Sequence, residues 1–263
     1  AIVTGGAQGF GFGIAQELIS EGAQVVIANR GEKAGLAAVE KLGDHSAFAQ
    51  CDVSVPESCR NLMIKAVEIF GGIDIFISNA GVLKAGALPN MTPEDFQAVT
   101  NIDYNGYFFC TKYVSEIMKA EYKADKSRFY DIIQINSKSG LVGSKANFAY
   151  AGAKFGGIGL TQSFALELVD WNIKVNSVCP GNYYDGPLWN DPEKGLFVKY
   201  LQAGKIPNGK TVQDSIEFYM NREPFQRGCT PEDIAAGVLY CIEQQFETGI
   251  ALPVTGGLAM GGL

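Results

Sequence analysis

The sequence predicts an α/β fold in which helices cover both faces of a doubly wound parallel sheet. Short apolar runs alternate with longer helical patterns along the chain. These runs are continuously apolar, which is typical of parallel strands buried on both faces. A glycine-rich turn separates the first such run from the first helical pattern. The length of 263 residues suits one large domain, so we expect a single domain over residues 1–263.

The apolar runs also give the expected order of elements. Strands are expected over residues 1–3, 25–28, 46–49, 73–78, 131–135, 173–178 and 250–254. Helices are expected over residues 12–21, 32–42, 56–70, 93–122, 148–170 and 231–245. Thr92 and Thr230 are each followed by Pro-Glu-Asp, which predicts a capped helix start at both places. The first run starts at Ala1 with nothing before it, so we expect the natural chain to begin a few residues earlier.

Residues 182–228 form the longest stretch without a clear pattern. They include Tyr183, Tyr184, Trp189 and Phe197. Long connections in α/β proteins often carry function, so we expect a lid here, with Tyr183 and Trp189 against a bound substrate. Aromatic residues equally favour an oligomer surface, and the sequence leaves both interpretations open.

Composition excludes several classes of protein. The net charge is −7 and there is no basic run, so we expect no nucleic-acid partner. No apolar stretch reaches 18 residues, so we expect no membrane span. Six scattered cysteines without a C-x-x-C pair fit the buried thiols of a cytoplasmic protein. With His45 as the one histidine, we expect no metal site.

The glycine-rich turn after the first strand predicts a dinucleotide site. Glycines let the backbone approach a pyrophosphate closely, and the N-terminus of the following helix attracts it. This strand–turn–helix order is that of a Rossmann-type fold. A turn without a ligand is the alternative. The residues expected to contact the cofactor here are Gly5, Gln8, Gly9, Phe10 and Gly11.

The end of the second strand bears on the choice of cofactor. A carboxylate at this place would bind the ribose 2′-hydroxyl of NAD. The chain has Asn29 and Arg30 instead, and a guanidinium suits a 2′-phosphate. We therefore expect NADP, with NAD as the alternative if Arg30 is only a solvated loop residue.

The ends of the third and fourth strands should border the same cofactor. Asp52 and Val53 follow the third strand, where the carboxylate can accept from the adenine amino group or form an Asx turn. Asn79, Ala80 and Gly81 follow the fourth strand, where small residues allow close approach. A structural role for Asn79 between strands is equally consistent with the sequence.

A proton-transfer site is predicted between residues 137 and 154. Ser137 follows the fifth strand, and Tyr150 and Lys154 lie four residues apart on a helix and share one face. An ammonium near a phenol favours the phenolate, so we expect Lys154 to lower the pKa of Tyr150. Such a site can serve an alcohol/ketone pair without histidine or metal.

These motifs together resemble the short-chain dehydrogenase/reductase family. Thr4–Gly11, Ser78–Gly81, Ser137, Tyr150–Lys154 and Cys179–Gly181 stand in the family's order along essentially the whole chain. The resemblance implies that Tyr150 is the general acid/base, that Lys154 binds the nicotinamide ribose, and that Ser137 orients the substrate. The family's fourth catalytic residue is an asparagine in the long central helix, and Asn101 is matched to it.

The resemblance also implies contacts to the nicotinamide from Pro180, Gly181 and Asn182. The family usually has a threonine where this chain has Asp185, so Asn182 or backbone groups are expected to serve the carboxamide. The family's usual assemblies imply a homodimer or homotetramer.

A narrower resemblance concerns the catalytic segment. Ile133–Gly140, Val142–Lys145 and Lys154–Gln162 are similar to the sorbitol-6-phosphate 2-dehydrogenase group of the family and to bifunctional sugar-phosphate aldolase/dehydrogenases. This implies a substrate of the sorbitol 6-phosphate/fructose 6-phosphate type, and we expect Lys138 and Lys145 to bind its phosphate. Alternatives are a reductase of a non-phosphorylated ketone or 3-oxoacyl chain, and a non-catalytic dinucleotide-sensing protein.

Overall fold

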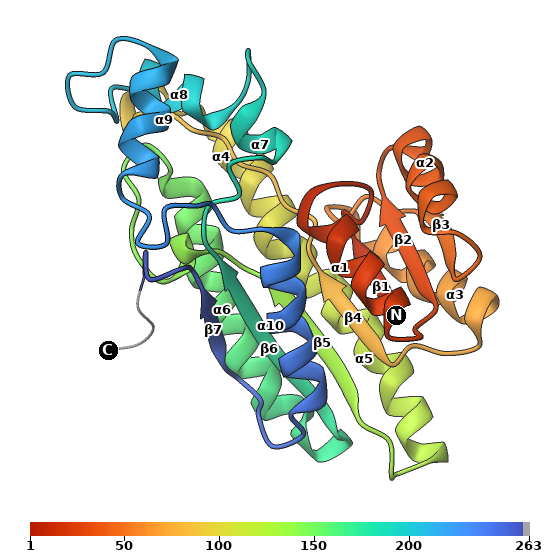
Figure 1. Cartoon of the computed structure of the whole chain (residues 1–263). Helices are drawn as coiled ribbons and strands as arrows, with labels where there is room; N and C mark the ends of the chain where they lie inside the picture. Colours follow the sequence, from red (N-terminus) through yellow and green to blue (C-terminus); the bar gives the residue numbers. More distant parts are fainter. Residues whose placement is uncertain (260–263) are drawn as a thin grey trace.

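In the computed structural model, which describes residues 1–259, seven strands form one parallel sheet in the order β3-β2-β1-β4-β5-β6-β7 (Figure 1). The strands are β1 (Ile2–Thr4), β2 (Val25–Asn29), β3 (Ser46–Gln50), β4 (Ile75–Ser78), β5 (Tyr130–Ile135), β6 (Ile173–Pro180) and β7 (Ala251–Val254). The strand order reverses between β1 and β4. In such sheets, a ligand site is expected outside the carboxyl ends of the strands at this switch point.

Helices pack on both faces of the sheet. The N-terminal half carries α1 (Gly9–Ser20), α2 (Glu32–Leu42), α3 (Pro56–Phe70), α4 (Pro93–Thr100) and α5 (Gly106–Ala124). The C-terminal half carries α6 (Phe148–Leu168), α7 (Pro187–Asn190), α8 (Leu196–Gln202), α9 (Val212–Met220) and α10 (Pro231–Glu243). Residues of α1, α2 and α10 share one core cluster, and residues of α3, α5 and α6 share the other. These two layers complete the expected doubly wound architecture.

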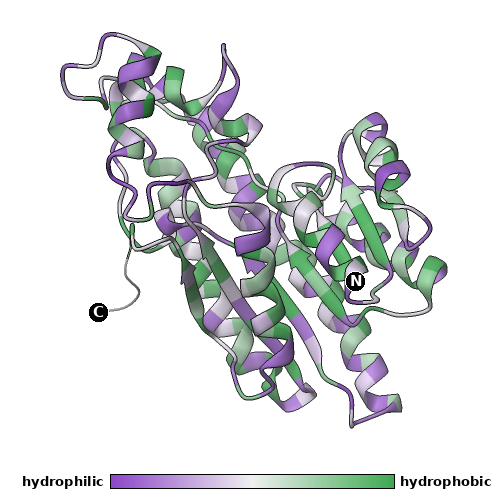
Figure 2. Ribbon diagram, in the orientation of Figure 1, coloured by the Kyte–Doolittle hydropathy of each residue, from purple (hydrophilic) through white to green (hydrophobic). Residues whose placement is uncertain are grey.

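The continuous apolar strands fill both clusters. Successive side chains of a strand point to opposite faces. Phe76 lies in the cluster with α3, α5 and α6, while its neighbour Ile77 lies in the cluster with α1 and α10. Ile132 and Ile133 of β5 divide in the same way. In Figure 2 the strands are mostly hydrophobic along their length, whereas hydrophilic residues are interspersed along the helices.

Both expected helix starts are confirmed. The Thr92 hydroxyl accepts from the Asp95 amide at 3.1 Å, and Thr230 and Asp233 form a complete capping box. The helix expected over residues 93–122 is interrupted, however. A π-helical turn over Asn101–Asn105 joins α4 to α5. Such a turn inserts an extra residue, and here it carries Asp103 inward, where its side chain is completely buried.

Residues 182–228 contain α7, α8 and α9, which the sequence did not predict. Their apolar residues do not reach the main core. They form a separate aromatic cluster, in which Trp189 packs against Phe197 at 5.0 Å and Tyr219 at 4.8 Å between ring centroids. The three helices that carry it lie beyond the carboxyl end of the sheet (Figure 1). This segment therefore has its own small core, and one side of it borders the pocket described below.

A buried ion pair ties α10 to the sheet. The ammonium of Lys174 on β6 lies 3.0 Å from the Asp131 carboxylate on β5. It also donates to the carbonyls of Cys241, Ile242 and Gln244 at the C-terminal end of α10. Burial raises the pKa of Asp131 to about 7, although Lys174 acts to lower it. Removing either partner of this pair would leave the other charge buried without compensation, which would lower the free energy of unfolding.

We predict that Lys174→Met destabilises the fold by about 3–5 kcal/mol, because it leaves a buried carboxylate and the last carbonyls of α10 without their partner. Lys65→Met is the matched control, since the exposed Lys65–Glu68 pair at 3.3 Å should contribute less than about 1 kcal/mol. Urea unfolding at pH 7.5 measures both. Equal effects of the two substitutions would contradict this role for Lys174.

Candidate active site

A cleft of about 690 Å³ runs along the carboxyl ends of the strands, from the end of β3 to the α7–α9 segment. The strand-end and turn motifs predicted from the sequence converge on it. Gly11, Asn101 and Lys145 are predicted site residues that do not line it. Those that do are Gly5, Gln8, Gly9, Phe10, Asn29, Arg30, Asp52, Val53, Asn79, Ala80, Gly81, Ser137, Lys138, Tyr150, Lys154, Pro180, Gly181, Asn182, Tyr183 and Trp189.

The glycine-rich turn has the shape of an anion cradle. Gly5 and Gly9 have φ of +62° and +59°, which glycine adopts without strain. A Cβ on Gly9 would meet no atom of residues 1–259 within 4 Å, so the space beside it is open to a ligand. In that part of the chain no side chain caps the N-terminus of α1, and its first N–H groups remain available to a pyrophosphate. Gly11 serves packing instead, because a Cβ there would lie 2.4 Å from Asn79 Nδ2.

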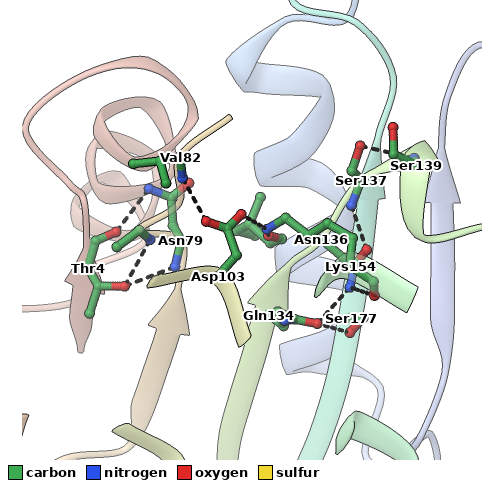
Figure 3. Close-up of polar contacts among 12 residues, drawn as sticks. Thr4, Asn79, Val82, Asp103, Gln134, Asn136, Ser137, Ser139, Lys154 and Ser177 are labelled. Atoms are coloured by element: carbon green, nitrogen blue, oxygen red, sulfur yellow. Dashed lines mark hydrogen bonds and ion pairs between the residues drawn. The ribbon is translucent and has the colours of Figure 1, made fainter. Parts of the chain in front are cut away.

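Thr4 and Asn79 clamp the two strands at the switch point (Figure 3). The Asn79 amide donates to the carbonyls of Thr4 and Gly5 at 2.9 and 3.2 Å. The Thr4 hydroxyl in turn accepts from the backbone N–H groups of Asn79 and Ala80 at 3.0 and 3.1 Å. Of the roles left open for Asn79, the structure shows the bridging one, and this bridge fixes the floor of the cleft.

Arg30 and Asp52 border the far end of the cleft. Arg30 is exposed, and no ion pair involving it is found within residues 1–259. Asn29 donates to the carbonyl of Gly31 at 3.1 Å, which leaves its side-chain oxygen unused by that bond. One oxygen of Asp52 accepts from the amide and hydroxyl of Ser54 at 3.0 and 2.6 Å. The Asx turn considered for Asp52 is therefore present, and its carboxylate still faces the cleft.

Asn136 locks the catalytic strand to the catalytic helix, and the sequence did not single it out. Its amide donates to the Gln134 side chain at 2.7 Å and to the Lys154 carbonyl at 3.0 Å, while its oxygen accepts from the Ser137 amide at 2.8 Å (Figure 3). Gly140 packs against this lock, because a Cβ there would lie 2.2 Å from Asn136 Oδ1. Ser137 is thereby held at a fixed place relative to α6.

The hydroxyl of Ser137 is oriented by its own loop. It accepts from the Ser139 amide at 3.1 Å, which leaves its proton free to donate. It faces the phenol of Tyr150 and helps to favour the phenolate. The two hydroxyl groups can therefore bind the same substrate oxygen.

Lys154 lies at the bottom of the cleft with its ammonium held on three sides. It lies 3.6 Å from the Asp103 carboxylate (Figure 3). It also donates to the Ile135 carbonyl at 3.0 Å and lies 5.4 Å from the centre of the Tyr150 ring. Burial acts to lower the pKa of Lys154, but the neighbouring Tyr150 and Asp103 outweigh it and leave the pKa raised. The lysine therefore stays charged beside Tyr150.

The pKa of Tyr150 differs from the expectation. Burial raises this pKa above its ordinary value, and the Lys154 charge lowers it but does not overcome burial. Asp103 adds to the rise. The lysine acts in the expected direction, yet the sequence pattern could not reveal the desolvation or the second, negative neighbour.

Asn101 does not join this group. It is exposed on the π turn, where its oxygen accepts from the Asn105 amide at 3.0 Å. Two residues further on, Asp103 is 2% exposed and contacts Lys154. The extra residue of the π turn places the Asp103 side chain, and not that of Asn101, against Lys154 of α6, so the catalytic role expected of Asn101 stays a prediction. Regular helical spacing cannot predict that placement.

Lys145 does not reach the cleft either. It is exposed on the loop before α6, and Lys205, which no sequence motif indicated, lines the cleft instead. The Lys205 ammonium donates to the Ser144 hydroxyl at 3.0 Å and lies 3.8 Å from the centre of the Tyr200 ring. Lys138 lines the same wall, as expected. Lys205 follows α8 in a segment without a sequence pattern, so its place depends on the tertiary fold.

The aromatic and amide residues after β6 divide between two roles. Tyr183 stacks on Phe10 of α1 at 5.1 Å and closes the cleft over the glycine-rich turn. Trp189 borders the cleft but is 6% exposed within the aromatic cluster. Asn182 donates its amide to Tyr184 and Glu223 at 2.7 and 3.0 Å. Those amide protons are therefore engaged within the α7–α9 segment, which leaves backbone groups for a carboxamide.

Comparisons with known proteins identify the family. The family model for short chain dehydrogenases matches residues 1–191. The chain belongs to the short-chain dehydrogenase family. Sorbitol-6-phosphate 2-dehydrogenase of Escherichia coli strain K12 is 33% identical over 99% of this chain and 98% of its own. The structure of sorbitol-6-phosphate 2-dehydrogenase from Erwinia amylovora matches with a TM-score of 0.89 and 31% identity, covering 99% of both chains. A variant of actinorhodin polyketide ketoreductase with NADPH matches at 0.86 and 29% identity, covering 98% of this chain and 95% of its own.

As a short-chain dehydrogenase, the protein is an oxidoreductase that acts on CH–OH groups with a nicotinamide cofactor. The observed site fits such a cofactor, because an open glycine cradle, an uncapped helix and a buried lysine follow one another along the cleft. Within residues 1–259, none of the helices combines the length and the apolarity that crossing a bilayer requires.

We predict that Tyr150→Phe leaves the fold and cofactor affinity intact but lowers turnover about a hundredfold or more, because we expect the phenol to act as the positioned acid/base. Steady-state oxidation of the reduced cofactor, with binding measured by fluorescence, separates the two effects. The exposed Tyr240→Phe is the matched control. Near-normal turnover in folded Tyr150→Phe protein would remove this residue from the mechanism.

Proposed function

We propose that the protein is an NADP-dependent dehydrogenase that interconverts a polyol phosphate and the corresponding ketose phosphate, of the sorbitol 6-phosphate/fructose 6-phosphate type. The observation that carries the substrate class is a group of cations on the cleft wall next to Ser137. The similarity to two sorbitol-6-phosphate 2-dehydrogenases supports the same class.

Lys138 and Lys205 on the cleft wall form this cationic group, and the charge of the exposed Arg222, which does not line the cleft, acts on both. Burial, and after it the charges of Lys138 and Arg222, together lower the pKa of Lys205 to about 8. Burial also lowers the pKa of Lys138, with Glu223 opposing and Arg222 contributing. A chain of net charge −7 thus concentrates mutually repelling cations beside its reactive serine. An anionic substrate group would relieve this repulsion and replace the lost solvation.

The position of the cations suits a phosphate remote from the reacting carbon. Lys138 directly follows Ser137, and Lys205 bonds to Ser144 on the loop between β5 and α6. A ketose held by Ser137 and Tyr150 would extend its chain along this wall. The α7–α9 segment contributes Lys205 and Tyr200, which supports a lid that closes on the substrate.

The chain's own residues would handle the proton. During oxidation the Tyr150 phenolate takes the hydroxyl proton of the substrate, and during reduction the phenol returns it. Ser137 donates to the same oxygen and fixes its position, while Lys154 stabilises the phenolate and binds the ribose. When bound, the nicotinamide supplies or accepts the hydride.

Arg30 supports NADP over NAD. It is a guanidinium at the end of β2, open to solvent and bordering the cleft, where a 2′-phosphate would lie. The ketoreductase relative is described with NADPH. A second candidate function is the reduction of a non-phosphorylated ketone or 3-oxoacyl chain. The cationic group would have no evident use in that reaction.

Exposed apolar groups support a homo-oligomer. Phe108 on α5 and Phe155 on α6 are 42% and 47% exposed. Gly152 and Gly159 of α6 have no atom of residues 1–259 within 4 Å of a built Cβ, so a partner helix could approach closely.

The six cysteines are free thiols, which supports a reducing compartment such as the cytoplasm.

For the cofactor, we predict that Arg30→Ala weakens NADPH binding by about 1.5–3 kcal/mol through a lost charged hydrogen bond and leaves NADH nearly unchanged. Lys41→Ala, at the other end of α2, controls for the loss of one surface charge. Titration of both cofactors into each variant checks this. Wild-type protein that binds NADH at least as tightly as NADPH would refute the proposed preference.

For the substrate, we predict that Lys205→Ala and Lys138→Ala each raise KM for fructose 6-phosphate about tenfold while kcat stays close to normal, since the lost contact is made equally in ground and transition states. The effect should shrink with added salt, because partly exposed charges are screened.

Lys145→Ala is the matched control, since it removes an exposed lysine from the same loop. It should leave KM unchanged. A similar rise in KM for free fructose in the Lys205 and Lys138 variants would show that these lysines do not bind the phosphate.

A further inference from the structure

A buried carboxylate faces the catalytic lysine. Asp103 reaches the site from the π turn between α4 and α5. One of its oxygens accepts from the Val82 amide at 2.7 Å, and the other lies 3.6 Å from the Lys154 ammonium (Figure 3). This second oxygen has no hydrogen-bond partner within the described residues, and the side chain is 0% exposed. Its interaction with Lys154 is therefore between charges.

The site is shaped around this carboxylate. A Cβ on Gly81 would lie 3.1 Å from Asp103 Oδ2, so a larger residue at position 81 would crowd it. An uncharged amide at position 103 could accept from Val82 equally well. The hydrogen bond therefore does not explain the charge, which must be sought in its effect on its neighbours.

Few other titratable groups surround Asp103 and its neighbours. Lys154 and Tyr150 face it from α6, Cys179 of β6 is near enough to act on both of them, and Tyr200 of α8 is near Tyr150. Burial raises the pKa of Cys179 to about 12 and raises the pKa of Tyr200 as well, so both stay neutral in the working range. Lys154 and Asp103 are thus the two charges that act on Tyr150 from within this group.

We propose that Asp103 is a positioning residue that balances the charge of Lys154, so that Tyr150 keeps its proton to higher pH than it would beside the lysine alone. The inference rests on the proposed acid/base role of Tyr150. Reduction of a ketone needs the protonated phenol, whereas oxidation of an alcohol needs the phenolate. Asp103 therefore helps to keep the phenol protonated, as reduction requires, and moves formation of the phenolate that oxidation requires to more alkaline pH.

The test is the pH dependence of kcat/KM in both directions for wild type and Asp103→Asn. Removing a negative charge lowers the proton affinity of Tyr150, so the phenolate forms at lower pH. Where kcat/KM for oxidation rises with pH, the variant should be about tenfold faster than wild type at the same pH. This corresponds to a rising limb of the pH profile that is displaced by about one pH unit toward acid. On the falling limb of reduction, the variant should be slower by a similar factor.

The difference should vanish in acid. Burial raises the pKa of Asp103 to about 6, although Lys154 and the Val82 amide act to lower it. Below that pH the wild-type residue is itself neutral, so the two profiles should converge. A uniform loss of activity at all pH values, an unmoved limb, or a limb moved to higher pH would overturn the proposal.

Three further variants complete the experiment. Asp103→Glu keeps the charge and should restore the wild-type limb; a limb displaced as in Asp103→Asn would contradict the proposal. Asp95→Asn removes an exposed carboxylate from neighbouring α4 and should leave both limbs in place. If Asp103→Asn does not fold, the smaller neutral Asp103→Ser should show the same acid displacement.

The outcome is separable from the proposed function. The pH dependence of kcat/KM can be measured with any ketone that the wild type reduces. This test therefore remains valid even if the substrate is not a sugar phosphate. Full activity of Tyr150→Phe would instead remove the acid/base role on which the inference depends.

Discussion

The buried ammonium of Lys154 is the constraint on which the rest of the site depends. A charge in a protein interior is stable only if other groups replace its water. Here the Ile135 carbonyl and the Asp103 carboxylate do so, from β5 and from the π turn. The lysine thereby holds together β5, the π turn between α4 and α5, and α6. Its charge also acts on the phenol of Tyr150, which lies one helical turn away on α6.

The surrounding polar groups hold this junction in place. Asn136 bonds to the backbone of Lys154 and to Gln134, and Gln134 in turn accepts from Ser177 on β6. Ser177 and Thr161 then continue the network into α6. Because the side chains of Asn136, Gln134, Ser177 and Thr161 are all hydrogen-bonded in this network, it favours one register between the strands and α6. The α7–α9 segment has its own aromatic core instead, so it can differ among relatives without disturbing this junction.

The parts of the fold that depend on local pattern were predictable. Buried parallel strands give continuous apolar runs, and capping residues mark helix starts, so the sheet and the starts of α4 and α10 were expected. Glycine turns likewise indicated the cofactor end of the cleft. The π turn that brings Asp103 against Lys154 was not predictable, because one inserted residue leaves no periodic signal. Lys205 was missed for a related reason: it reaches the cleft from a segment folded by tertiary aromatic contacts.

Wild-type kinetics test most directly the proposed selection of a phosphorylated substrate by the cations next to Ser137. The measurement is kcat/KM for reduction of fructose 6-phosphate and of free fructose with NADPH, at low and at high salt. Two charged contacts predict a preference of about a hundredfold or more for the phosphorylated ketose, expressed mainly in KM and reduced by salt. Equal kcat/KM for the two sugars, or a preference for the free sugar, would contradict the account.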